Sequence, residues 1–221
     1  MTFGTEILII ELIGIIAFAI SGALVAMKKH FDLFGIIVLG VMTAVGGGAV
    51  RDIILGINPP AMFKNSLYVF VAFITSVAAF MAGAVAALKF KKNKKFFMDI
   101  VNFFDAIGLG VFGVTGTNTA IINGHAENAF LSIFVGVVTG IGGGMLRDIL
   151  AGKIPFVLYK DVYASAAIIG AAMYYIMYIN HVNSFVSVSS SILVTILVRL
   201  LASFYHLGLP KIPVIKIPKE K

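Results

Sequence analysis

The sequence predicts an all-α protein that crosses a membrane several times, and three observations support this. Of its 221 residues 60% are apolar and 12% are charged, whereas a soluble domain is nearer half apolar and a quarter charged. Low-charge stretches of about 20 residues, the length that spans hydrocarbon, recur along the chain. Two groups of motifs also occur twice in the same order. We therefore expect a polytopic membrane protein of seven transmembrane helices, built as an inverted three-plus-three helix repeat plus a seventh helix.

Seven apolar stretches can each form one of these helices, because turn formers or charged residues end every one of them. The expected spans are 6–27, 32–56, 67–88, 97–121, 128–152, 162–180 and 185–206. They divide one membrane domain into a first three-helix repeat at 1–92, a second, inverted repeat at 93–182, the seventh helix at 183–207 and a basic cytoplasmic tail at 208–221.

Lysine and arginine residues gather beside alternate ends of these spans, and this bias indicates orientation. The loop at Lys28, the lysines between 89 and 95, the joint at Lys153 and Lys160 and the tail share one side. The N-terminus is therefore expected outside and the C-terminus in the cytoplasm, with the tail near anionic lipid headgroups. Topology thus accounts for the net charge of +7, and no nucleic-acid partner is expected.

The internal repeat rests on matching motifs. Gly46-Gly47-Gly48 followed by Arg51-Asp52 recurs as Gly142-Gly143-Gly144 followed by Arg147-Asp148. Upstream, the residues Glu11, Gly14, Phe18, Ser21 and Gly22 align with Asp105, Gly108, Phe112, Thr115 and Gly116. Each copy holds three helices, an odd number, so the second copy enters the membrane from the opposite face.

Three consecutive glycines inside an apolar helix predict a kink or an unwound turn. Each glycine weakens a helix by roughly 1 kcal/mol relative to alanine, and a break frees carbonyls and amides to line a cavity. The stripes of small residues that include Gly40 and Gly136 favour close helix packing instead. The pore or gate candidates are Thr43, Gly46, Gly47, Gly48, Arg51, Asp52, Thr139, Gly142, Gly143, Gly144, Arg147 and Asp148.

The Arg-Asp pairs carry charge at membrane depth, which usually faces an interior or a watery cavity. Adjacent helix residues point about 100° apart. We therefore expect the arginine of one repeat to pair with a carboxylate of the other. Such a cluster either fixes the packing of the repeats or serves conduction and gating, and both interpretations stay open. Thr43 and Thr139 either replace part of an ion's hydration shell or bond to carbonyls of their own helices.

A further polar patch lies near the end of the fourth span. Its residues, with the partner of Thr115 in the first span, are possible pore lining or ordinary interhelical hydrogen bonds: Ser21, Thr115, Thr117, Asn118 and Thr119. Glu11 and Asp105 come near the beginnings of their helices, where the helix dipole favours a negative charge. That interpretation suffices for both, so neither is expected to be a ligand.

The sequence offers little for catalysis. It contains no cysteine, and its four histidines are scattered without ligand spacing. No serine, histidine and acid form a recognisable nucleophilic triad. We expect neither an enzyme, nor a metal site beyond a transient monovalent cation, nor a cofactor.

Two G-G-G-x-x-R-D-x-x-x-G motifs in a chain of this organisation resemble the prokaryotic branch of the trimeric intracellular cation (TRIC) channel family, also known for a glycine-transporter-like domain. The resemblance covers about residues 5–206. It implies a homotrimer in a bacterial or archaeal cell membrane. Each protomer would hold a pore for monovalent cations such as potassium and sodium, chiefly potassium, between the kinked second and fifth helices.

Two functions therefore remain. The first is a cation channel that is narrow where the two glycine motifs meet. The second is a secondary transporter of a small zwitterion such as glycine, because inverted repeats with broken helices are common in transporters and helix N-termini bind carboxylates. Periodicity does not separate the two, and the resemblance favours the channel.

Overall fold

The chain forms a bundle of helices. The computed structural model describes residues 3–89, 94–158 and 162–205. Its long helices are α1 (Phe3–Lys28), α2 (Leu33–Ile54), α4 (Leu67–Lys89), α5 (Lys94–Ala120), α6 (Ala129–Leu150), α7 (Tyr163–Ile179) and α8 (Ser184–Phe204). Short helical turns are α3 (Ala61–Lys64), the π-helical η1 (Ile121–His125) and the 3-10 turn η2 (Phe156–Leu158). The all-α fold class is confirmed, and the long helices begin and end within a few residues of the expected spans.

Within the part of the chain that the structure describes, five helices are long and apolar enough to cross a membrane. They are Glu6–Lys28, Leu33–Ile54, Phe96–His125, Ala129–Leu150 and Ser184–Phe204, while Leu67–Gly83 and Tyr163–Ile179 are shorter apolar helices. Large apolar side chains such as Phe34 and Phe130 point outward, as lipid contact requires. The protein is thus an integral membrane protein, and the count of seven spans stays a prediction. The basic tail and Lys160 lie outside the described residues.

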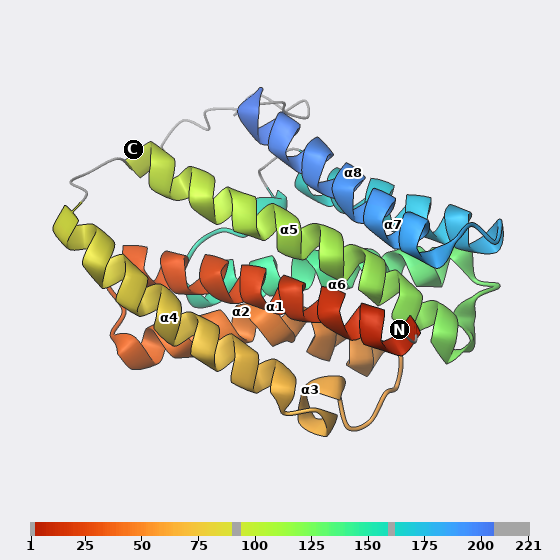
Figure 1. Cartoon of the computed structure of the whole chain (residues 1–221), viewed down its shortest axis with the longest axis horizontal. Helices are drawn as coiled ribbons and strands as arrows, with labels where there is room; N and C mark the ends of the chain where they lie inside the picture. The colour runs from red at the N-terminus through yellow and green to blue at the C-terminus, as the bar shows by residue number, and fades with distance from the viewer. Residues whose placement is uncertain (1–2, 90–93, 159–161, 206–221) are drawn as a thin grey trace, which may run out of the picture.

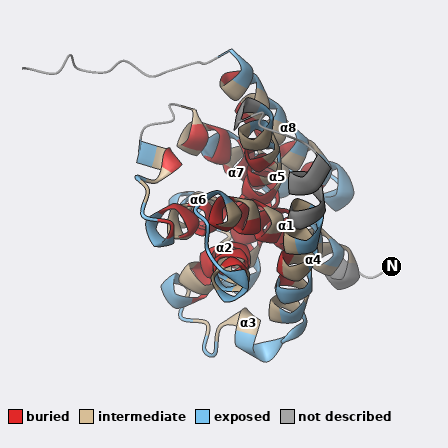
Figure 2. Cartoon of the chain, turned by 90° about the vertical axis from the view of Figure 1, so that its left-hand side faces the viewer, coloured by how far each residue is buried: buried red, intermediate tan, exposed pale blue. Residues whose placement is uncertain are grey.

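Four helices make the centre of the bundle. α1 packs on α2, α5 on α6, α1 on α5, and α2 on α6, as Figure 1 shows. α4 lies against α1 and α2, whereas α7 lies against α5 and α6, and α8 covers α5 and α7. The rings of Phe18 and Phe112, aligned residues of the two repeats, stack at 5.3 Å between centroids where α1 meets α5. Buried residues are concentrated between these central helices, as the view along the bundle shows (Figure 2).

Side-chain caps and glycines set the ends of the central helices. Asp32 accepts a hydrogen bond from the Gly35 amide at the start of α2, and Asn128 accepts one from the Leu131 amide at the start of α6. α2 and α6 both end on a glycine with positive φ, Gly56 at +67° and Gly152 at +63°. Glycine adopts this left-handed conformation with little strain, because it has no side-chain carbon. The last glycine of each repeated motif is therefore a helix stop.

The unwound turn expected at the three glycines is wrong, and the alternative of a kink stays a prediction. α2 and α6 continue as helix through Gly46–Gly48 and Gly142–Gly144. A side-chain carbon on Gly47 would overlap the carbonyl oxygen of Thr139, and one on Gly143 would overlap the carbonyl oxygen of Thr43. The glycines therefore let the backbones of α2 and α6 touch, which is the packing role that small residues have in membrane helices.

The close crossing of α2 and α6 predicts that alanine substitutions at two neighbouring glycines change the heat stability of the protein differently. Gly47→Ala is expected to lower the apparent melting temperature of the detergent-solubilised protein. Overpacking costs about 1–3 kcal/mol, more than the roughly 1 kcal/mol that alanine gains over glycine in a helix. Gly48→Ala is the matched control, because the nearest atom to its new carbon would be Arg51 Nη2 at 3.9 Å. A Gly47→Ala protein at least as heat-stable as the Gly48→Ala protein would contradict the close crossing.

Candidate functional site

The arginine and aspartate of each repeated motif form one unit in the last turn of the helix. Arg51 Nε donates to Asp52 Oδ1 at 2.8 Å, and Arg147 Nε donates to Asp148 Oδ1 at 2.9 Å. The second oxygen of each aspartate reaches past the helix end. Asp52 Oδ2 accepts from the Ala61 amide at 2.6 Å, and Asp148 Oδ2 accepts from the Phe156 amide at 3.0 Å. Each aspartate therefore orients its arginine and also anchors the segment that follows.

The expected pairing between the two repeats is wrong. The Arg51 guanidinium approaches Glu11 of α1, with Nη1 at 3.7 Å from Oε1. Arg147 Nη1 lies 2.6 Å from Asp105 Oδ1 of α5. The same-half acid is within reach because α1 runs beside α2 and α5 beside α6. A neutral group does cross between the repeats: Arg147 Nη1 also donates to Ser21 Oγ of α1 at 2.7 Å.

The second cluster, formed by Asp105, Arg147, Asp148, Tyr163 and Arg199, is buried. Tyr163 lies against it from α7, because its hydroxyl and Asp105 Oδ1 are the two groups nearest to a side-chain carbon built on Gly144. The Arg199 guanidinium of α8 stacks on the Tyr163 ring at 4.9 Å from its centroid. The cluster thus holds two carboxylates and two guanidinium groups inside protein.

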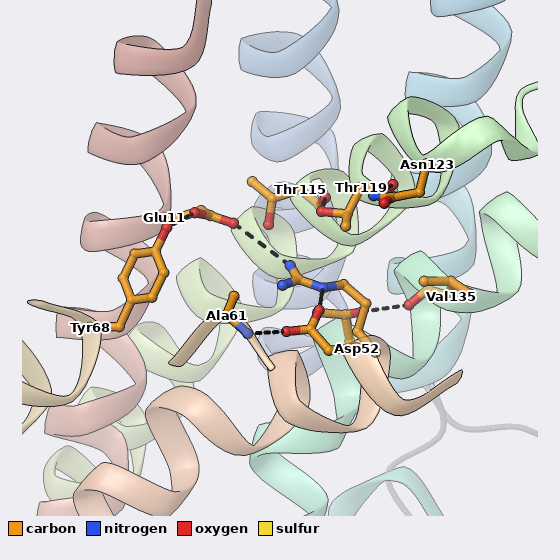
Figure 3. Close-up of polar contacts among 10 residues, drawn as sticks. Glu11, Asp52, Ala61, Tyr68, Thr115, Thr119, Asn123 and Val135 are labelled. Atoms are coloured by element: carbon orange, nitrogen blue, oxygen red, sulfur yellow. Dashed lines mark hydrogen bonds and ion pairs between the residues drawn. The ribbon is translucent and has the colours of Figure 1, made fainter. Parts of the chain in front are cut away.

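The first cluster, formed by Glu11, Arg51, Asp52 and Tyr68, faces a small pocket. Tyr68 of α4 donates its hydroxyl to Glu11 Oε2 at 2.6 Å, as Figure 3 shows. The Glu11 side chain keeps 15% of its surface exposed, against 0% for its counterpart Asp105. The pocket is lined by Glu11, Ile15, Ala44, Val45, Gly48, Ala49, Arg51, Asp52, Ala61, Met62, Tyr68 and Phe112. One copy of the motif therefore lines a pocket, and the other is sealed inside the protein.

Lys153 follows the sealed cluster, just beyond the end of α6. Partial burial lowers the pKa of its ammonium group, and the nearby Lys28 and Arg147 act in the same direction, whereas Asp148 opposes them. The end of α6 is thus crowded with positive charge on the side that the lysine bias assigns to the cytoplasm.

The predicted polar side chains of α2, α5 and α6 divide into three kinds. Four threonines donate to carbonyls of their own helices, at distances between 2.6 and 2.9 Å: Thr43 to Leu39, Thr139 to Val135, Thr117 to Gly113 and Thr119 to Thr115. Asn118 accepts from the Tyr174 hydroxyl at 2.8 Å. The Thr115 hydroxyl is buried without a hydrogen-bond partner. Of the predicted pore or gate residues, Gly48, Arg51 and Asp52 line the pocket. The remaining glycines of the motifs lie where α2 crosses α6, except Gly144, which packs against Tyr163 and Asp105.

The interpretation of Glu11 and Asp105 as helix-dipole residues is wrong. Both lie well inside α1 and α5, and the acidic residue in the first turn of α1 is Glu6. An acid at that depth in an apolar helix needs a positive partner, and the alignment of Glu11 with Asp105 was the signal for one. Tyr68, Tyr163 and Arg199 carried no such signal, because their contacts depend on which helices pack together. Within the described ranges no group of three or more His, Cys, Asp or Glu side chains could hold a metal ion.

The two acids predict unequal losses of stability. Asp105→Asn removes one partner of a buried ion pair, a change that costs about 3–5 kcal/mol. Glu11→Gln is expected to cost clearly less, because its ion pair is 3.7 Å long and partly exposed. The apparent melting temperatures of the two variants in one detergent measure the difference. Equal losses would contradict the inequality of the clusters.

Comparisons with known proteins agree with this architecture. A family model described as "Glycine transporter" matches residues 8–84 and 102–179, so each match holds one copy of the repeated motif. A "UPF0126 membrane protein" of Vibrio cholerae is 38% identical over 91% of this chain and 81% of its own length. The "UPF0126 inner membrane protein YadS" of Escherichia coli K12 is also 38% identical, over 91% of this chain and 93% of its own.

Solved structures with the same fold are cation channels. The TRIC trimeric intracellular cation channel orthologue from Rhodobacter sphaeroides superposes with a TM-score of 0.83 at 29% identity, over 92% of this chain and all of that chain. A prokaryotic TRIC channel in 0.5 M KCl has a TM-score of 0.82 at 32% identity, over 94% of this chain and all of that one. The chain therefore belongs to the TRIC channel family, to which the "Glycine transporter" family model corresponds.

Proposed function

We propose that this protein is a potassium-conducting channel, a homotrimer in which each protomer has its own pore for monovalent cations. The kinship with trimeric cation channels supports this proposal. The observation that carries it is the pocket at the end of α2. Its charged side chains are Glu11, Asp52 and Arg51, two carboxylates and one guanidinium. A net negative pocket raises the local concentration of cations and repels anions.

The proposed topology has seven spans, with the second three-helix unit inverted relative to the first and the N-terminus outside. In that arrangement the pocket at Arg51 opens outward and the sealed cluster at Arg147 faces the cytoplasm. The contact of Gly47 with the Thr139 carbonyl lies on the line between α2 and α6. A cation that passes there needs the two helices to move apart, so we infer that this structure is a closed protomer.

A second candidate function, transport of glycine, is favoured by the name of the matching family model. The pocket argues against it. A zwitterion needs a positively charged group that binds its carboxylate. The guanidinium at the pocket belongs to Arg51, which already pairs with Asp52 at 2.8 Å and approaches Glu11. α2 also presents to the pocket its C-terminal end, where the helix dipole repels a carboxylate.

Purified protein in a planar bilayer decides between the two functions. We expect discrete unitary currents in potassium chloride without any added substrate. In a gradient of potassium chloride, the reversal potential should lie closer to the equilibrium potential of potassium than to that of chloride. Saturable uptake of labelled glycine into proteoliposomes, with no unitary current, would instead establish the transporter.

The charge of the pocket predicts the effect of one substitution. Asp52→Asn is expected to lower the unitary potassium conductance or to shift the reversal potential towards that of chloride, because it removes a negative charge from the pocket. Asp99→Asn makes the same change of charge at an exposed position of α5 and should leave both quantities unchanged. If the two variants conduct alike as intact oligomers, Asp52 serves only to anchor Arg51.

A further inference from the structure

α1 shows how far apart the two arginine clusters lie. Its Glu11 approaches Arg51 in the first cluster, and its Ser21 accepts a hydrogen bond from Arg147 in the second. Glu11 and Ser21 are ten positions apart in one continuous helix, which corresponds to about 15 Å along its axis. The two clusters therefore lie at different levels of the bundle, and an ion that visits both has to cross the distance between them.

An aromatic pair, Phe18 of α1 and Phe112 of α5, lies between these two levels. The two residues align in the repeat, and their rings stack at 5.3 Å between centroids with planes 29° apart. Both belong to one apolar core cluster, together with Ile15 and Ala19 of α1. Phe112 also lines the pocket at Arg51. The aromatic pair therefore borders the pocket through Phe112.

Phe18 continues from the pocket towards the second cluster. Its side chain is buried, and a side-chain carbon built on Gly143 of α6 would lie 2.8 Å from its ring. On the next residue, Gly144, such a carbon would meet the Tyr163 hydroxyl and Asp105 Oδ1, which belong to the second cluster. The pocket, the aromatic pair and the second cluster thus follow one another through the protein.

We propose that the aromatic pair is the gate of the conducting pathway, a barrier that keeps the water and ions of the pocket away from the second cluster. Hydrophobic constrictions in channels stop conduction because they exclude water. When α2 and α6 move apart, Gly143 withdraws from Phe18, and the ring gains room to turn away from Phe112. The gate rests on the proposed function and names the side chains that hold the pathway closed.

The other role open to the aromatic pair is packing of α1 on α5, and polarity separates the two roles. Leucine and asparagine have similar sizes, but only asparagine attracts water. In planar bilayers with potassium chloride, we expect Phe112→Asn to raise the fraction of time that the unitary current is on. Phe112→Leu should raise it much less, because the barrier stays apolar. Phe18→Asn and Phe18→Leu repeat the comparison at the other ring, so the test stands if one variant fails to fold.

A stack elsewhere on the protein supplies the control for loss of an aromatic ring. Phe130 and Phe134 of α6 stack at 5.9 Å between centroids, and both are exposed. Phe134→Asn makes the same chemical change as Phe112→Asn away from the pocket. It should leave the fraction of open time unchanged.

A thiol on the far side of the aromatic pair reports the barrier without any current. The sequence contains no cysteine, and Ser21→Cys places a thiol beside Arg147. A water-soluble methanethiosulfonate reagent is added to the detergent-solubilised full chain, and mass spectrometry measures the rate of modification. We expect slow modification when Ser21→Cys is the sole change, and a faster rate when Phe112→Asn is added than when Phe112→Leu is added.

The two measurements separate failure of the gate from failure of the channel. Equal rates of modification in the asparagine and leucine proteins, or equal fractions of open time, would overturn the gate, while unitary currents of the wild type would still support the channel. Faster modification of the asparagine protein, with no current from the wild type or any variant, would reject the channel and keep the barrier.

Discussion

Burial of an arginine among apolar helices is the constraint on which this structure depends. A guanidinium without a partner in a low-dielectric interior costs several kcal/mol, so the arginine of each repeated motif needs carboxylates at hand. Arg147 finds one beside it on α6 and another on α5. Arg51 finds its own on α2 and α1. The need for these acids requires α5 beside α6 and α1 beside α2, which is the pairing around which the other helices gather.

Glycine then joins the two pairs. Because Gly47 and Gly143 have no side chains, α2 and α6 approach until backbone meets backbone, and the helices that carry the two motifs join in one bundle. The halves are alike in sequence but unequal in surroundings. α8 covers α5 and brings Arg199 to the second cluster, whereas the first cluster remains beside a pocket. The repeated motif supplies two charged sites, and the first of them lines a pocket.

Much of the fold could be predicted from residue types alone, because apolar length and turn formers mark the ends of membrane helices. The contacts could not. Helix propensity describes how much Gly47 destabilises its own helix. It does not include the backbone of α6, which packs into the space that a side chain would occupy. The choice of Glu11 rather than an acid of the other repeat as partner of Arg51 depends on which helices are neighbours. The role of Arg199 depends on the packing of a helix outside the repeat.

The absence of cysteine from the sequence permits a direct test of the central claim, that the pocket at Arg51 is the mouth of the conducting pathway. Ala49 lines that pocket, so Ala49→Cys places one thiol there on a background without others. Reaction with a positively charged thiol reagent during bilayer recording is predicted to reduce the potassium current, and reduction of the mixed disulfide to restore it. Complete modification of the introduced thiol, established by mass spectrometry, with an unchanged current would contradict the account.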